Sequence, residues 1–249
     1  MAVLVLGRPA VRAGGVVLRP ARRMARVLLG MLALRPNRRL SLEWIVDGLW
    51  PERPPASAAA NVRSHIAALR GLLTPGDDGT AIETLDDGYA LVTGRTGVDA
   101  LWFEHLVHEG RRRRGTGEDT EAARVLAEAL GLWRGDLLEG VPIPAAVQSR
   151  AVVLDDLRMS TTEELVDVRL ALGHQRDLVP VLKGLVVEHP LRERLWHQLL
   201  LALVATGRRG EAMDAYRRLS VLLDVELGVR PNPATTALLD LIRHTGLDG

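Results

Sequence analysis

The chain has 249 residues, of which 47% are hydrophobic and 25% are charged, a composition that is typical of folded proteins and excludes a disordered chain. It has no cysteine, which excludes disulfide scaffolds, cysteine-ligated zinc and thiol catalysis, and favours the cytosol. The apolar runs are far shorter than the ~18 to 20 residues that cross a bilayer, so we expect a cytoplasmic protein without a membrane segment or signal peptide. Since one domain usually has about 100 to 200 residues, two domains are expected.

The formal net charge of +1 hides an uneven distribution of charge. Residues 1–73 contain twelve arginines and three acidic residues, a net charge of +9, so residues 74–249 carry −8. A polyanion would therefore meet the N-terminal segment first. Contacts between arginine and phosphate give affinity without sequence information and make binding depend strongly on salt.

The first part of the chain mixes strand and helix patterns. Val3 to Leu6 and Val16 to Leu18 are β-prone runs, and Gly14-Gly15 between them predicts a small antiparallel hairpin. Apolar residues then recur at three- and four-residue spacing after Pro20, which predicts a helix that ends near Leu34. Ser41 is a suitable N-cap for a second helix that reaches Trp50.

A third helix and a second hairpin follow. The helix is predicted from Ser57 to Leu73, where Thr74-Pro75-Gly76 stops it. Ile82 to Thr84 and Tyr89 to Val92 then flank Asp86-Asp87-Gly88, which predicts a β-hairpin. Strand, three helices and a terminal hairpin are the order of a winged helix-turn-helix domain.

The remainder of the chain is predicted to be helical. Seven helices are expected, at about residues 100–113, 118–133, 145–172, 176–188, 191–205, 210–226 and 234–244. Gly173 and Gly207 are 34 residues apart, the period of tetratricopeptide repeats, although a plain helical bundle is the alternative. We therefore predict a mostly α protein, with an α+β winged helix-turn-helix domain over residues 1–95 and an all-α tetratricopeptide-like domain over residues 98–249.

The third helix has an apolar stripe and an opposite face of small residues. At about 100° per residue, Ile66, Leu69 and Leu73 fall within about 40° of Val62, and this stripe should be buried. The opposite face consists of Ser57, Ala60, Ser64, Ala67, Ala68 and Gly71. Arg63 and Arg70 flank one side of it, and Asn61 and His65 flank the other. A helix that is merely packed on one side and polar on the other is the alternative.

This surface would suit the major groove of DNA. Small residues allow close approach, asparagine can bind adenine, and arginine can bind guanine or phosphate. Catalytic patterns, by contrast, do not occur: the sequence has no G-x-S-x-G elbow, no phosphate loop of the G-x-x-x-x-G-K type and no H-E-x-x-H zinc helix. We therefore expect no enzymatic activity, no cofactor and no metal.

Several motifs resemble a known family. Those of the first part are similar to the OmpR-type winged helix: Leu18-Arg19-Pro20, Val27-Leu28-Leu29, Leu49-Trp50, Pro54-Pro55, Asn61-Val62-Arg63-Ser64-His65-Ile66-Ala67-Ala68-Leu69-Arg70 and Gly88-Tyr89. Those of the second part resemble the bacterial transcriptional activation domain: Trp133 to Leu138, His189 to Glu193, Gly207 to Ala212, Tyr216 to Leu219, and Glu226 to Val229 with Pro231. This pairing resembles the SARP family, the antibiotic regulatory proteins of actinomycetes.

The resemblance implies an activator of a secondary-metabolite gene cluster. It implies binding to promoter double-stranded DNA at direct repeats near the −35 region, recruitment of RNA polymerase holoenzyme through the sigma factor, and a homodimer on DNA in the nucleoid. By the same resemblance, Ser57 to Leu73 is the recognition helix, the hairpin around Asp86 to Tyr89 is the wing, and the loop Pro51 to Ala56 faces polymerase.

Two departures from the family pattern remove basic residues. Ala67-Ala68 and Asp86-Asp87 stand where many relatives carry arginine or lysine, so DNA affinity would depend on dimers or on polymerase. Our hypothesis is that Asn61, Arg63, Ser64 and His65 contact the groove. The DNA backbone would be contacted by Arg22, Arg23, Arg38, Arg39 and Arg70. The rival interpretation is a tetratricopeptide-like adaptor whose winged domain has lost specific DNA binding.

Overall fold

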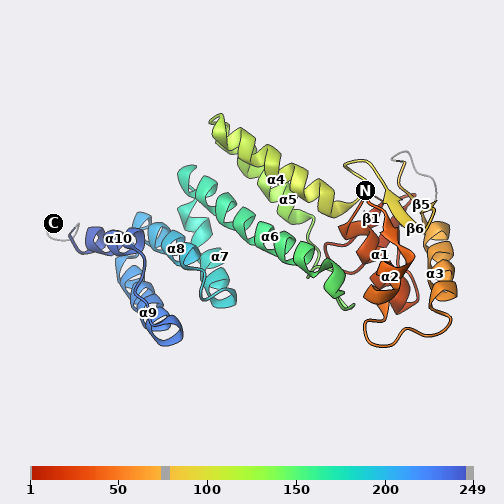
Figure 1. Ribbon diagram of the computed structural model, residues 1–249. Helices are drawn as coiled ribbons and strands as arrows, with labels where there is room; N and C mark the ends of the chain where they lie inside the picture. Colours follow the sequence, from red (N-terminus) through yellow and green to blue (C-terminus); the bar gives the residue numbers. More distant parts are fainter. Residues whose placement is uncertain (1, 74–78, 245–249) are drawn as a thin grey trace. The chain divides into compact units, whose positions relative to one another are not determined.

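The computed structural model describes residues 2–73 and 79–244, and within these ranges it is mostly helical with short strands, as the sequence predicted (Figure 1). The strands are β1 (Val3–Leu4), β2 (Ala10–Ala13), β3 (Val16–Leu18), β4 (Leu40–Ser41), β5 (Ala81–Leu85) and β6 (Gly88–Val92). The helices are α1 (Arg23–Leu34), α2 (Leu42–Leu49), α3 (Ala58–Leu72), α4 (Asp99–Gly115), α5 (Asp119–Gly131), α6 (Ala145–Ala171), α7 (Gln175–Glu188), α8 (Glu193–Ala205), α9 (Arg209–Leu227) and α10 (Pro233–His244).

The N-terminal sheet differs from the predicted hairpin. Its strand order is β1-β2-β3, with Val3 opposite Val11 and Val11 opposite Leu18, all antiparallel. The sequence predicted that Val3 to Leu6 pairs directly with Val16 to Leu18. This prediction is wrong, because β2 lies between β1 and β3. The alanines at both ends of β2 give it a weak β pattern, which is why the sequence did not reveal it.

The winged helix forms as predicted. Ser41 caps α2, since its Oγ accepts a hydrogen bond from the backbone N–H of Trp44 at 3.1 Å. The second sheet has the order β4-β6-β5, in which Leu40 lies opposite Tyr89 and Thr84 lies opposite the same residue. The predicted stop of α3 at residues 74–76 lies outside the described residues.

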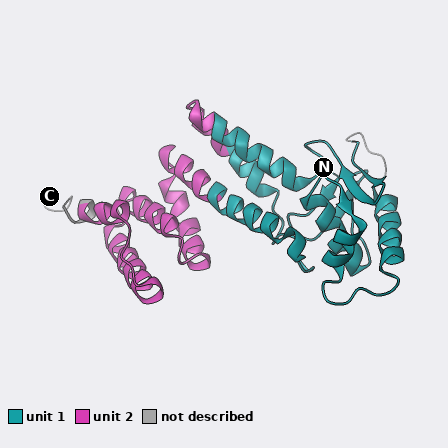
Figure 2. Cartoon of the chain, viewed as in Figure 1, with its two compact units in different colours: residues 1–112, 124–161 teal, residues 113–123, 162–249 magenta. Residues whose placement is uncertain are grey.

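The chain divides into two compact units, residues 1–112 with 124–161 and residues 113–123 with 162–249 (Figure 2). The first unit extends beyond the winged helix because α4, α5 and the first part of α6 share its hydrophobic core. Phe103 of α4 is fully buried and packs edge-on against Trp133, with ring centroids 5.5 Å apart. Leu138 packs so closely on α1 that a Cβ on Gly30 would lie 2.7 Å from its Cδ2.

In the second unit, α7 packs on α8, α8 packs on α9, and α10 contacts both α8 and α9. Gly173 and Gly207 end their helices with positive φ of 88° and 73°. In both cases the next residue donates its N–H to a carbonyl five positions earlier: His174 to Arg169 and Arg208 to Leu203. This repeated left-handed helix ending explains the 34-residue spacing and confirms the tetratricopeptide-like arrangement. None of the described helices is long and apolar enough to span a membrane.

Candidate nucleic-acid interface

The buried stripe of α3 is confirmed. Val62, Ile66 and Leu69 are 0%, 1% and 0% exposed, and Leu73, directly after the helix, is 8% exposed. These side chains join the core that α1 and α2 line, so hydrophobic burial fixes which face of α3 points outward.

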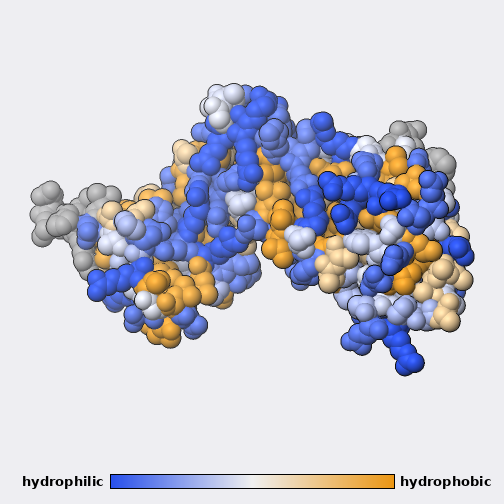
Figure 3. Space-filling view, in the orientation of Figure 1, coloured by the Kyte–Doolittle hydropathy of each residue, from blue (hydrophilic) through white to orange (hydrophobic). Residues whose placement is uncertain are grey.

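The opposite face of α3 is exposed and consists almost entirely of small residues. We call it the recognition face and define it as Ala60, Arg63, Ser64, Ala67, Ala68 and Gly71. Figure 3 shows pale, weakly apolar surface over part of this helix. Arg63 is the one long cationic side chain in this set, so it is the one member with a long reach toward base edges.

His65 is buried and does not belong to the recognition face. It is 7% exposed, and its Nδ1 has no hydrogen-bond partner among the described residues. Burial lowers the pKa of His65, and the positive charge of Arg22 lowers it further. The helical geometry explains the burial, because position 65 lies about 40° from Leu69 at the edge of the buried stripe.

Asn61 lies at the border of the recognition face. It is partly buried, and its Nδ2 donates a hydrogen bond of 3.3 Å to Oγ of Ser57, one turn earlier on the same side. This bond uses one of the two N–H donors of the amide, so the second N–H and the amide oxygen are still available for a base.

Arg70 connects α3 to the wing. Its Nε donates to the carbonyl of Ile82 at 2.8 Å, and its Nη2 donates to Oγ1 of Thr84 at 2.7 Å. The guanidinium also lies 6.0 Å from the ring centroid of Tyr89. Arg70 therefore positions β5 and β6 beside α3, as Figure 1 shows, and has fewer donors left for phosphate.

Arg39 is engaged by the acidic wing turn. Its Nη1 donates to Oδ1 of Asp87, and both side chains are a little more than half exposed. A backbone hydrogen bond also connects the wing turn to the start of α2, because the N–H of Leu42 donates to the carbonyl of Asp87 at 2.7 Å. The wing turn thus neutralises one of the arginines that the sequence assigned to the DNA backbone.

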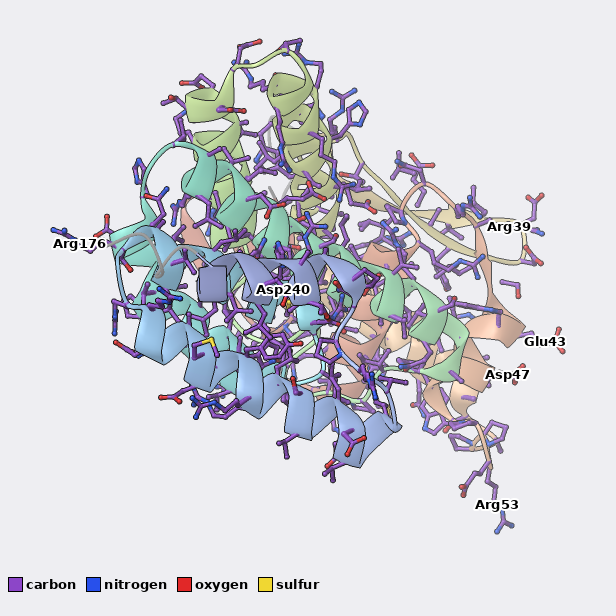
Figure 4. The ribbon with its side chains drawn as sticks, turned by 90° about the vertical axis from the view of Figure 1, so that its left-hand side faces the viewer. Arg39, Glu43, Asp47, Arg53, Arg176 and Asp240 are labelled. Atoms are coloured by element: carbon purple, nitrogen blue, oxygen red, sulfur yellow. The ribbon has the colours of Figure 1, made fainter. Side chains whose placement is uncertain are left out.

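The other predicted backbone contacts are exposed. Arg22 and Arg23 stand at the start of α1, where no side chain caps the described helix end, and Arg38 lies in the turn after α1. The structure also points to Arg53, which extends from the loop between α2 and α3 away from the ribbon (Figure 4). The only sequence signal for Arg53 was its place in the loop before the recognition helix.

Within the described residues, no three histidine, aspartate or glutamate side chains gather as a metal site would require. The candidate interface therefore consists of the recognition face, the exposed arginines at the start of α1 and in the loop before α3, and a wing held by Arg70.

Comparisons with known proteins agree with this architecture. The model of the bacterial transcriptional activator domain family matches residues 98–243. The chain is 32% identical over 241 residues to the regulatory protein DnrI of Streptomyces peucetius, covering 93% of this chain and 88% of that one. It is 36% identical over 213 residues to the regulatory protein AfsR of Streptomyces griseus, of which it spans 21%.

A solved structure is similar over nearly the whole chain. It is Mycobacterium tuberculosis EmbR in complex with low affinity phosphopeptide, with a TM-score of 0.89 and 28% identity. The match covers 98% of this chain and 65% of EmbR.

Proposed function

Since the chain belongs to the SARP family of transcriptional regulators, which are not enzymes, we propose that it activates transcription by binding promoter double-stranded DNA through α3. Residues 1–95 would bind DNA and residues 98–249 would act on the transcription machinery. Arg63 and Ser64 would contact bases from the recognition face. Arg22, Arg23 and Arg38 would contact phosphates, and Arg70 would hold the wing.

The observation that carries this proposal is the exposed recognition face with arginines around it. The net charge of +9 over residues 1–73 provides attraction for DNA, and the small residues of α3 allow close approach to a groove. Because base-reading side chains are few, much of the affinity would come from phosphate contacts, and binding would be strongly salt-dependent.

The test is fluorescence anisotropy with a promoter fragment that neighbours the gene of this chain and a scrambled fragment of equal length. Arg63→Ala should make the binding free energy for the promoter fragment less favourable by about 1 to 3 kcal/mol. The binding free energy for the scrambled fragment should stay nearly unchanged. Arg38→Ala is the matched control, because loss of the phosphate contact proposed for Arg38 should weaken binding to both fragments alike and reduce the salt slope by about one unit. Undiminished preference for the promoter fragment in the Arg63 variant would contradict the assignment.

We propose that the chain activates a secondary-metabolite gene cluster and binds direct repeats near the −35 region as a homodimer. It would recruit RNA polymerase holoenzyme through the sigma factor and reside in the cytoplasm at the nucleoid. Footprinting of the neighbouring promoters with and without polymerase tests this, because two protected repeats and an extension with polymerase are expected. Protection of one half-site alone would contradict the dimer.

A second candidate is a protein-interaction adaptor without specific DNA binding. It is favoured by the alanines of the recognition face and by the engagement of Arg39 with Asp87. Equal, weak affinity for promoter and scrambled fragments at every salt concentration would support the adaptor.

A further inference from the structure

A pocket of ≈ 490 Å³ opens in the first compact unit between α1, α2 and the segment 142–146 that leads into α6. Its walls are mainly apolar and include Met24, Val27, Leu49 and Ile143. Its volume and its apolar lining are those of small-molecule sites, which usually occupy about 300 to 1,000 Å³. Neither DNA binding nor the family comparison accounts for this pocket.

Its polar groups are few and unevenly placed. The indole of Trp44 lines the pocket, and the guanidinium of Arg35 lies 5.1 Å from its ring centroid. Arg23 and Asp47 line the same pocket from exposed positions on α1 and α2. Asp47 extends outward on the ribbon view, so we place its carboxylate at the rim (Figure 4).

The end of the pocket at α1 is electropositive. Arg23 is the first residue of α1, and the first turn of this described helix has neither an acidic residue nor a side-chain cap. The free backbone N–H groups of a helix start add a partial positive charge to that of the guanidinium. An anionic group is therefore favoured at this end, while apolar rings are favoured along the opposite wall.

We propose that this pocket binds a flat, mainly apolar small molecule that carries one acidic group, with its rings beside Trp44 and its acid toward Arg23. Such a molecule would contact both the winged helix and the segment before α6, and so would stabilise the first compact unit. None of the pocket residues lies on the recognition face, and Arg23 is the one residue that lines the pocket and is also proposed to contact a DNA phosphate.

The probes are two fluorescent dyes that differ by one acidic group: anilinonaphthalene sulfonate and the same ring system without sulfonate, N-phenylnaphthylamine. Titration of the full chain should show one saturable site for each dye. Ala145→Phe places a ring in the pocket from an exposed position and should weaken both dyes about tenfold or more, whereas Ala145→Ser should not. Ala171→Phe adds the same ring to an exposed position at the other end of α6 and should leave both affinities unchanged.

Arg23→Gln tests whether the acidic group of the ligand binds Arg23. It should weaken the sulfonate dye about tenfold and leave the neutral dye unchanged, because only the sulfonate makes a charge-assisted hydrogen bond. Equal weakening of both dyes would overturn the role of Arg23. Unchanged affinities of both dyes for Ala145→Phe would show that the dyes do not bind in this pocket. So would loss of both dyes in Val225→Ser, because Val225 is 72% exposed on α9, where Figure 3 shows apolar side chains.

Discussion

Arg134 donates a hydrogen bond from Nη2 to Oδ2 of Asp99 at 2.6 Å. Asp99 is the first residue of α4 and is 0% exposed, and its carboxylate also accepts the backbone N–H groups of Val5 and Leu6 at 2.8 to 3.1 Å. Burial raises the pKa of Asp99, and the hydrogen bond from Arg134 opposes this rise. One buried carboxylate thus joins the end of β1, the start of α4 and the segment after α5.

Arg134→Ala should lower the free energy of unfolding by about 3 kcal/mol, since a buried carboxylate that loses its cationic partner retains only backbone donors. Urea unfolding followed by circular dichroism measures the change. Arg8→Ala is the matched control, because Arg8 pairs with Glu139 at the surface, with 63% of its side chain exposed. Its loss should cost less than about 1 kcal/mol, and equal losses in both variants would contradict the assigned role of Asp99.

Gly30 and Gly71 should respond to alanine in opposite directions. A Cβ on Gly30 would lie 2.7 and 2.8 Å from the two terminal carbons of Leu138, whereas a Cβ on Gly71 would meet nothing within 4 Å. Gly30→Ala should therefore destabilise the protein by about 1 to 3 kcal/mol through overpacking. Gly71→Ala, in an exposed part of α3, should stabilise it by about 0.5 to 1 kcal/mol. Thermal unfolding measures the stability of both variants. An increase in stability in Gly30→Ala would show that α1 and Leu138 are not in close contact.

The contact between Gly30 and Leu138 also shows where sequence reasoning fails. Periodicity predicted α1 and the buried stripe of α3, because local spacing decides which face of an amphipathic helix is apolar. It could not predict that the core of the winged helix continues into α4, α5 and α6, since that packing joins residues about a hundred positions apart. The sequence boundary between residues 95 and 98 therefore does not coincide with the boundary of the compact unit.

The same distinction applies to the candidate interface. Arg63 was assigned from its angle on the helix, and the structure places it on the exposed face. Arg70 has a similar angle, but its guanidinium binds Ile82 and Thr84, which reach it only once the hairpin has folded against α3. Helical angles give the direction of a side chain and say nothing about the partners that other segments bring to it.

Asp87→Ala should strengthen DNA binding. The substitution releases Arg39 and removes a negative charge from the wing turn, so the affinity for any duplex should rise several-fold and the salt slope should increase by about one unit. Anisotropy titrations over a range of salt concentrations measure both quantities. In the Arg39→Ala background the release of the arginine is no longer possible, so the increase should be smaller. An equal increase in both backgrounds would mean that Arg39 does not contact DNA.

His65 should make stability depend on pH below neutrality. Its folded pKa lies below the usual 6.5, so the unfolded chain binds a proton first as the pH falls, and unfolding becomes more favourable. The loss is at most about 1.4 kcal/mol per pH unit for one group. His65→Gln should therefore flatten the fall in unfolding free energy between about pH 7 and pH 5, measured by urea unfolding. His197, whose pKa burial also lowers, lies in the second compact unit, so His197→Gln should flatten the profile independently and the two effects should add. If the unfolding free energy of His65→Gln falls with pH as steeply as that of the unsubstituted chain, the His65 ring is protonated as easily in the folded chain as in the unfolded one.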